Sequence, residues 1–253
     1  MLFNYHTHTK RCNHAIGEDR EYVEQAIAHG VKTLGFSDHA PYLFPNGHCA
    51  PFRMKNEELH EYANSIRALA KEYKDDIRIL CGFELEFYPD FHKQEMEFLS
   101  AVKPDYLILG QHFVGNELNG YYAHRHEYLG ELLLTAYVTQ ALAGLATGDF
   151  LYLAHPDLIG YEYDPDVRER EFRRLCEGAK RMGIPLELNL LGIREDRCYP
   201  TRKFFEIAAS VGNDIIIGAD SHSPGSVFDS NSEQIAMDMV NELGLKLITK
   251  PLL

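Results

Sequence analysis

The sequence lacks any apolar run approaching the ~20 residues of a membrane-spanning helix. Its opening residues also lack the basic-then-apolar layout of a secretory signal peptide. We therefore expect a cytoplasmic protein that makes no membrane contact. Internal repeats, low-complexity segments and linkers are absent as well, so residues 1–253 are expected to form a single domain.

Cysteine and positive charge are both scarce. Five cysteines are scattered through the 253 residues without a CxxC motif, which is typical of reduced thiols rather than of a disulfide framework. The 25 lysines and arginines are outnumbered by 38 aspartates and glutamates, so the formal net charge is −13. This balance, without a stripe of basic and aromatic residues, argues against long nucleic acid as a partner but leaves a short nucleotide open.

What the chain does contain is a regular alternation of short apolar runs and longer amphipathic stretches. The predicted strands are Leu2–His6, Thr33–Ser37, Ile77–Phe83, Tyr106–Gly110, Phe150–Ala154, Pro185–Asn189 and Asp214–Gly218. The predicted helices are Asp19–His29, Asn56–Lys74, Glu127–Thr147, Asp166–Met182, Thr201–Val211 and Ser232–Leu243. This pattern indicates an α/β protein with a mostly parallel sheet. Seven units favour a closed or nearly closed (β/α) barrel, with a doubly wound open sheet as the alternative.

Polar residues stand where these apolar runs end. His6 and His8 close the first run, and their spacing of two puts both side chains on one face, where they can reach one cation together. His14 can return to the same place from the following loop. Five further runs end in the same way, in Asp38-His39, Glu84 with Glu86, His112, His155, and Asp220 with His222. In a (β/α) barrel these ends form one face, on which active sites are built.

The residues around these positions resemble the PHP (polymerase and histidinol phosphatase) family, and its histidinol-phosphatase branch best. The matching motifs are His-Thr-His-Thr at 6–9, Cys-Asn-His-Ala at 12–15, Gly-Phe-Ser-Asp-His-Ala-Pro at 35–41, Gly-Phe-Glu-Leu-Glu at 82–86, Ala-His-Pro-Asp-Leu-Ile at 154–159 and Gly-Ala-Asp-Ser-His-Ser-Pro at 218–224. The resemblance implies a distorted (β/α)7 TIM-like barrel that holds two or three divalent metal ions.

The resemblance also implies a ligand set. The first metal would take His6, His8, Glu84 and Asp220, and the second would share Glu84 and add His112 and His155. The third would take His14, His39 and His222, and His222 would also take part in catalysis. Zinc, iron and manganese all suit such a mixture of imidazoles and carboxylates.

The activity implied by the resemblance is metal-dependent hydrolysis of a small phosphate monoester, most specifically of L-histidinol phosphate in histidine biosynthesis. A hydroxide that bridges two metals would attack phosphorus. Two alternatives stay open: a phosphoesterase acting on another small ester, a nucleotide or oligonucleotide ends, and a non-catalytic, metal-stabilised module. Phosphate release after metal addition separates the enzymes from the module.

Further residues are assigned by their chemistry. Asp38 is predicted either to protonate the leaving group or to orient His39 through a hydrogen bond. Arg194 is predicted to bind phosphate, since a guanidinium can bond two of its oxygens, with a surface salt bridge as the alternative. Arg125 is a weaker candidate for the same role. Glu86 is expected to contact a cationic part of the substrate or to form a core-edge hydrogen bond.

Two features of the loops bear on the substrate. The loop 41–53 is expected to cover the mouth of the barrel, with Arg53 belonging either to this lid or to the surface. Gln111 stands where the phosphatase branch often has an apolar residue, next to the unusual segment 115–125, which is expected to border the leaving-group pocket.

Overall fold

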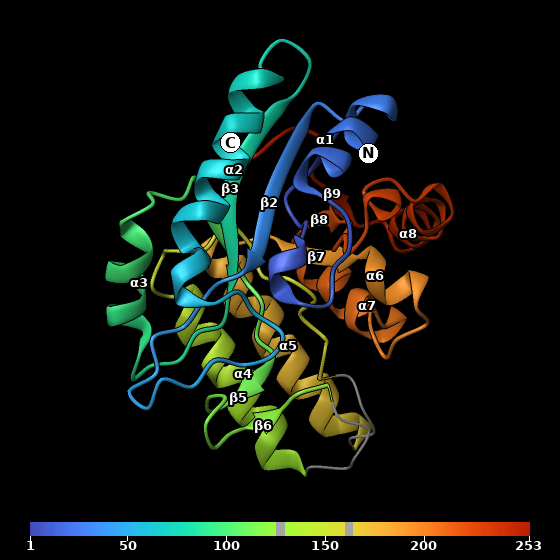
Figure 1. Cartoon of the computed structure of the whole chain (residues 1–253). Coiled ribbons are helices and arrows are strands. Elements are labelled where there is room, and N and C mark those ends of the chain that lie inside the picture. Colours follow the sequence, from blue (N-terminus) through green and yellow to red (C-terminus); the bar gives the residue numbers. More distant parts are fainter. Residues whose placement is uncertain (125–129, 160–163) are drawn as a thin grey trace.

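The computed structural model describes residues 1–124, 130–159 and 164–253, and its centre is a curled parallel sheet surrounded by helices (Figure 1). Four adjacent parallel strands follow the order β1-β2-β3-β4, with bounds Phe3–Asn4, Thr33–His39, Arg78–Leu85 and Tyr106–Leu109. A second parallel group has the order β7-β8-β9, with bounds Leu186–Asn189, Asp214–Gly218 and Lys246–Leu247.

Short bridges join these two groups into a barrel. Leu153 bridges Leu109 on one side and Leu186 on the other, so the predicted strand Phe150–Ala154 occupies its place in the ring through isolated bridges alone. A bridge between Thr7 and Ser221 closes the ring beyond the ends of β1 and β8. The barrel therefore has seven strand positions among the described residues, which confirms the distorted (β/α)7 fold over the open sheet.

The helices pack outside the barrel (Figure 1). They are α1 Asp19–Ala28, α2 Leu59–Glu72, α3 His92–Ser100, α4 Glu131–Leu145, α5 Pro165–Met182, α6 Leu190–Arg194, α7 Arg202–Val211 and α8 Ser230–Leu243, with 3-10 turns η1 Lys10–Cys12, η2 Asn56–Glu58 and η3 Pro224–Ser226. Local signals set several ends: the Asp164 side chain accepts hydrogen bonds from the first amides of α5, and Pro165 starts that helix. In the described part of the chain, every helix falls short of the combined length and apolarity that crossing a bilayer requires.

Besides β9 and the 3-10 turns, two helices and one hairpin were not predicted. Helix α3 was not predicted because only two of its residues, Glu95 and Leu99, are buried, so its sequence shows almost no helical periodicity of apolar residues. The hairpin of β5 (Phe113–Val114) and β6 (Tyr121–Tyr122) has only two residues in each strand. Helix α6 is a single turn that directly follows β7. The predicted helix Glu127–Thr147 is present from Glu131, and residues 127–129 lie outside the described ranges.

The two ends of the barrel differ. A cluster that includes Tyr5, Tyr106 and Tyr152 fills its interior toward the amino ends of the strands. The Tyr106 hydroxyl lies 2.7 Å from the Tyr5 carbonyl oxygen and 3.0 Å from that of Phe36, so one phenol links three neighbouring segments of the barrel wall. Both chain termini lie toward this end, whereas the carboxyl ends of the strands point toward β5 and β6 (Figure 1).

Candidate metal centre

The carboxyl ends of the strands gather all nine predicted ligands into one cluster. His6 and His8 follow β1, His39 ends β2, Glu84 lies near the end of β3, His112 follows β4, and Asp220 and His222 follow β8. His14 comes from the turn after η1, and His155 follows the bridging segment. Five sets of donor atoms, each with its members within 4.8 Å of one another, together contain His6, His8, His14, His39, Glu84, His112, His155, Asp220, His222 and one further residue, Cys12.

Glu84 stands at the middle of the cluster with its two oxygens directed to different histidines. Its Oε2 lies 3.6 Å from His6 Nε2 and 3.5 Å from His8 Nε2. Its Oε1 lies 2.8 Å from His155 Nε2 and 3.5 Å from His112 Nε2. A carboxylate placed in this way can bridge two cations. The adjacent strand leaves space for it, because a Cβ at Gly110 would come within 1.9 Å of Glu84 Oε1.

Asp220 completes one side of the cluster, and two histidines form its outer edge. Asp220 Oδ1 lies 3.6 Å from His6 Nε2 and 3.2 Å from His8 Nε2, so it faces the same space as Glu84 Oε2. At the edge, His222 Nε2 and His14 Nε2 are 3.0 Å apart. His39 approaches Glu84 Oε2 through Nδ1, at 3.1 Å, and also belongs to the donor set of His14 and His222.

The cluster passes a direct test of metal fit, because seven of its imidazole and carboxylate atoms are buried and lack hydrogen-bond partners among the described residues. These atoms are His6 Nε2, both ring nitrogens of His8, His39 Nδ1, Glu84 Oε2, His155 Nδ1 and Asp220 Oδ1. Leaving a buried polar atom unpaired costs about 1–3 kcal/mol, so a concentration of them points to an absent bonding partner. Imidazole nitrogens and carboxylate oxygens are together the donors expected around zinc, iron or manganese.

The two carboxylates and two of the histidines have pKa values shifted toward the forms that bind metals. Burial would raise the pKa of Glu84, but the surrounding histidines, led by His112, hold it well below its usual range. Asp220 behaves in the same way, with His6 as its main stabilising neighbour. Burial, reinforced at His222 by the neighbouring His8, lowers the pKa of His39 and of His222 well below 6.5. Ionised carboxylates and neutral imidazoles are the forms that bind metals.

Glu187 supports the cluster from behind and was not predicted. His6 Nδ1 donates to Glu187 Oε1 over 2.8 Å, which directs the opposite ring nitrogen, Nε2, toward the centre. Glu187 Oε2 also accepts from the backbone N–H of His155 at 2.9 Å. A Cβ at Gly218 would come within 1.8 Å of Glu187 Oε1. The only sequence signal is a glutamate inside an otherwise apolar strand, which indicates an inward-facing carboxylate.

Glu86 and Arg53 form a second buried support. His112 Nδ1 donates to Glu86 Oε1 over 2.9 Å, and Arg53 Nη2 donates to Glu86 Oε2 over 3.1 Å. Arg53 also bonds Glu117 and the carbonyl of Ala40. Glu86 thus has the hydrogen-bonding role rather than the substrate contact. Arg53, of which 1% is exposed, fixes the end of the loop 41–53 beneath the cavity and is not a surface residue.

Asp38 lies behind His8 and is fully buried, which does not fit a proton donor to the leaving group. Its Oδ1 lies 3.4 Å from His8 Nδ1, and its Oδ2 accepts from the Thr9 hydroxyl. Its contact with His39 is to the backbone N–H, at 2.9 Å. The geometry therefore favours the orienting role, with His8 in place of His39 as the ring that it faces.

The arginines near the site differ in their position relative to the cavities. Arg194 ends α6, and its Nη2 lies 3.3 Å from the Asp220 carbonyl oxygen. It lines a hollow of about 560 Å³ next to His14 and His222. Arg125 lies outside the described residues. Arg197, which was not predicted, reaches the main cavity and is paired with Glu195 at 2.9 Å through Nε.

The main cavity lies directly over the cluster and holds about 690 Å³. One wall is aromatic: Phe52 and Phe113 stack at 6.0 Å between ring centroids, and Phe113 lies 5.3 Å from Tyr122. Gln111, by contrast, is buried with its amide held by Phe87 N and Phe113 O, so it supports the hairpin rather than lining the cavity.

Comparison with known proteins agrees with this geometry. Over 239 residues the chain is 33% identical to a probable histidinol-phosphatase of Deinococcus radiodurans, covering 89% of this chain and 88% of the relative. It is 24% identical to the histidinol-phosphatase of Bacillus subtilis, covering 88% and 94% of the two chains.

The fold is shared with a solved histidinol phosphate phosphatase of Lactococcus lactis in complex with zinc, L-histidinol and phosphate. The TM-score is 0.76 at 20% identity, with 98% of this chain and 95% of that chain covered. The PHP domain family matches residues 4–191. With the family match spanning most of the chain and a relative at 33% identity, the chain belongs to the PHP domain family.

Proposed function

We propose that this protein is a metal-dependent phosphatase that hydrolyses L-histidinol phosphate to L-histidinol and phosphate. The observation that carries the proposal is the set of buried, unpartnered imidazole and carboxylate atoms around Glu84, beneath a cavity of about 690 Å³. The names of the relatives and the ligands of the Lactococcus lactis protein support the choice of substrate.

Three groups of residues would hold divalent ions. Glu84, Asp220, His6 and His8 would form the first, and Glu84 would be shared with His112 and His155 in the second. His14, His39 and His222 would form the third. Zinc, iron or manganese would supply an activated water for attack on phosphorus and would neutralise charge on the phosphate oxygens.

The other residues orient and bind. Glu187 and Glu86 hold the Nδ1–H groups of His6 and His112, which fixes the ring directions. Arg194 and Arg197 are the guanidinium groups nearest the two hollows and would bond phosphate oxygens. Because Asp38 is buried behind His8, His222 is the better candidate for proton transfer at the mouth, where it lines both hollows.

The cavity wall fits the organic part of this substrate. Phe52, Phe113 and Tyr122 offer flat apolar faces on which an imidazole ring can stack. Glu195 contributes a carboxylate to the same cavity, where it would attract the substrate's ammonium group.

The extent and location of the enzyme are also proposals. Residues from both ends of the chain complete one barrel, because Thr7 bridges Ser221 and β9 pairs with β8. We therefore take residues 1–253 as a single phosphoesterase domain. Cys12, Cys49, Cys81 and Cys176 are free thiols, as expected in the reducing cytoplasm.

The test is a comparison of substrates on protein of known metal content. We expect kcat/KM for L-histidinol phosphate to exceed ~10⁴ M⁻¹s⁻¹ and to lie far above the values for p-nitrophenyl phosphate and a short single-stranded oligonucleotide. Turnover of p-nitrophenyl phosphate with little L-histidinol phosphate hydrolysis would keep the metal chemistry and reject the substrate. No phosphate release from any of the three after metal loading would reject the enzyme altogether.

A further inference from the structure

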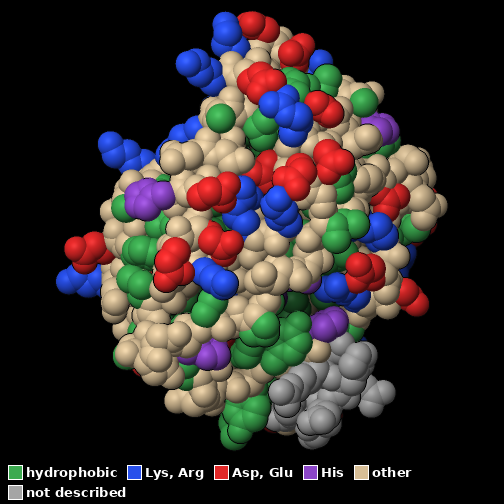
Figure 2. All heavy atoms as spheres, in the orientation of Figure 1, with side chains coloured by type: hydrophobic (Ala, Val, Ile, Leu, Met, Phe, Trp, Pro, Cys, Tyr) green, Lys and Arg blue, Asp and Glu red, His purple; other side chains and the backbone are tan. Residues whose placement is uncertain are grey.

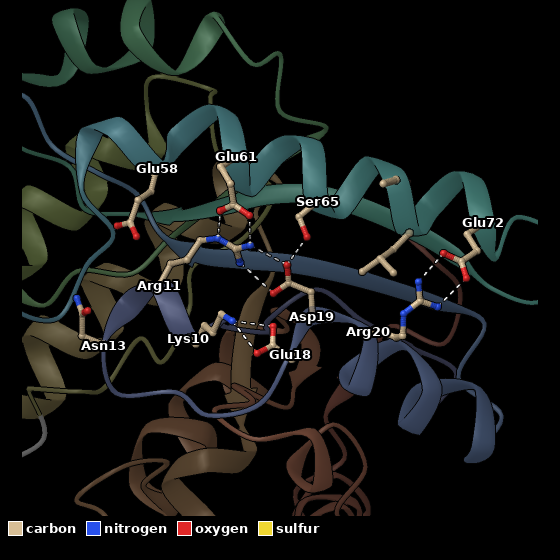
Figure 3. A pocket seen from close by; sticks show the side chains of 12 residues that line it. Lys10, Arg11, Asn13, Glu18, Asp19, Arg20, Glu58, Glu61, Ser65 and Glu72 are labelled. Atoms are coloured by element: carbon tan, nitrogen blue, oxygen red, sulfur yellow. Dashed lines mark hydrogen bonds and ion pairs between the residues drawn. The ribbon is translucent and has the colours of Figure 1, made fainter.

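Cys12 is a tenth residue at the metal centre. It ends the turn η1, between His8 and His14 in sequence, and its side chain is fully buried. The two residues before it face the other way: Lys10 and Arg11 extend into a groove on the outer side of the turn, where their charges are paired with carboxylates (Figure 3). The outer side of the turn thus carries charges that are already paired, and its inner side carries the thiol.

The thiol of Cys12 lies close to ring nitrogens of two histidines. Its sulfur, a nitrogen of His8 and a nitrogen of His222 are all within 4.8 Å of one another. The Cys12 carbonyl accepts from His14 Nδ1 at 2.8 Å, so the other nitrogen of His14, Nε2, is directed toward His222 Nε2, 3.0 Å away.

His8 provides a second observation that points to a ligand here. Its side chain is 1% exposed, and both of its ring nitrogens lack a hydrogen-bond partner among the described residues. Its Nε2 faces Glu84 and Asp220, and its Nδ1 lies 3.4 Å from Asp38 Oδ1 without hydrogen-bond geometry, so the ring has bonding capacity that a cation at this edge could use. The ring of His8 stacks on that of His222 at 4.1 Å between centroids, which keeps the space between them and Cys12 compact.

We propose that Cys12 Sγ is a direct ligand of the metal that His222 binds at this edge of the centre, which would give that metal one soft donor. Thiolates favour Zn²⁺ and Co²⁺ over Mn²⁺ and Mg²⁺, whereas an all-imidazole and carboxylate set discriminates less. Cys12 would therefore bias this position toward zinc. This inference rests on the proposed metal centre but not on the identity of the substrate.

The competing explanation is a buried thiol that only packs, and the chain offers matched controls. Cys81 and Cys176 are as deeply buried as Cys12. Burial raises the pKa of the Cys81 thiol to about 12, as expected for an inert structural cysteine. Neither belongs to a donor set in the described part of the chain.

The first test is the absorption spectrum of the Co²⁺-substituted protein. We expect a thiolate-to-cobalt charge-transfer band in the near ultraviolet in the wild type and in Cys176→Ala. The band should be absent from Cys12→Ser and Cys12→Ala, whose visible cobalt bands would show that metal is still bound. A wild-type spectrum without the band, or a band retained by both Cys12 variants, would overturn the proposal.

The second test does not depend on how the variants fold. X-ray absorption of the zinc-loaded wild type should detect a sulfur neighbour at about 2.3 Å from zinc, and its absence would count against the proposal. Where the variants fold, their preference for Zn²⁺ over Mn²⁺ should fall by about tenfold or more. Both readouts concern the metal alone, so they stand whether or not L-histidinol phosphate is hydrolysed.

Discussion

The two hollows on either side of the loop Thr9–His14 differ in how their polar groups are satisfied. The outer groove, between α1 and α2, is the larger, at about 840 Å³ against about 690 Å³ for the cavity over the metal centre. Its charges pair with one another: Lys10 with Glu18, Arg20 with Glu72, and Arg11 with both Asp19 and Glu61 (Figure 3). Blue and red side chains accordingly intermingle over this face of the molecule (Figure 2).

The metal centre shows the opposite condition. His155 Nε2 bonds Glu84 Oε1 at 2.8 Å, but the contacts of Glu84 Oε2 and Asp220 Oδ1 with His6, His8 and His39 span 3.1–3.6 Å without hydrogen-bond geometry. Several of these atoms have no partner in the described residues. Neither size nor charge therefore marks the functional hollow. What distinguishes it is a set of buried imidazole nitrogens and carboxylate oxygens that have no hydrogen-bond partner among the described residues.

The largest effect is expected from removing a ligand. Asp220→Asn and His8→Ala should lower kcat/KM by ~10²-fold or more and release metal, because they delete donors around the first ion. Glu72→Gln, which removes a carboxylate from the groove, should change neither. Metal analysis and steady-state kinetics decide, and a fully loaded, fully active His8→Ala protein would exclude His8 as a ligand.

Removing the buried ion pairs of the outer groove should lower the free energy of unfolding rather than the activity. Arg11→Met leaves Asp19 buried without its guanidinium, at a cost of about 3 kcal/mol, or a fall in Tm of about 6–12 °C. At saturating metal, kcat should stay near that of the wild type. Arg20→Met, which removes an exposed pair, is the control and should leave Tm nearly unchanged. Equal Tm values for the two variants would mean that the Arg11 pair adds no more than a surface one.

Weakening the support behind the centre should give an intermediate effect. Glu187→Gln loses the anionic acceptor of His6 Nδ1–H, so metal affinity should fall about 10- to 100-fold while high metal concentration restores activity. Titration with metal measures this change. Glu171→Gln, at a buried glutamate of α5 that pairs with Arg174, is the control for losing a buried carboxylate far from the metal centre. Unchanged metal affinity would rule out the support role.

Arg194→Ala and Arg197→Ala should separate phosphate binding from metal binding. We expect kcat/KM to fall about 10- to 100-fold, the equivalent of losing one charge-assisted hydrogen bond, with metal content intact. Inhibition by inorganic phosphate should weaken in parallel. If only one variant shows the effect, that arginine is the phosphate ligand, and metal loss in either would contradict the assignment.

The smallest effect is expected on the pH dependence of stability, from Glu95, a buried carboxyl that lines neither the outer groove nor the cavity over the metal centre. Burial raises the pKa of Glu95 to about 8, so between about pH 4.5 and 8 the folded protein keeps a proton that the unfolded chain releases. Stability should therefore decline as pH rises through this window. Glu95→Gln keeps an acceptor for the backbone N–H of Leu43 and should reduce the decline, by up to about 1.4 kcal/mol per pH unit. Thermal unfolding at pH 5.5 and 7.5 measures it, and parallel curves for both proteins would refute the shift.

The alternation of strands and helices, and the polar residues at the strand ends, could be predicted from the sequence because both follow from local rules. Strands end where apolar runs end, and residues such as Glu84 and Asp220 stand at those ends. The nine-residue ligand set came from the resemblance to the PHP family, and it stays a prediction. The support of the centre depends instead on contacts between distant segments. Glu187 meets His6 across 181 positions, and Arg53 meets Glu117 across 64, which no periodicity encodes. The sequence left Asp38 open between a proton donor and an orienting residue for the same reason, since only the folded chain shows which histidine it faces.

The closed, termini-bearing end of the barrel has a practical consequence for handling the protein. The amide of Leu252 lies 3.0 Å from the Tyr5 hydroxyl, and the carbonyl oxygen of Leu253 bonds Arg78 at the start of β3. A tether attached after Leu253 would therefore leave the side of the molecule opposite the cavity. The enzyme could be immobilised on a solid support through that point with its mouth open to a flowing substrate solution.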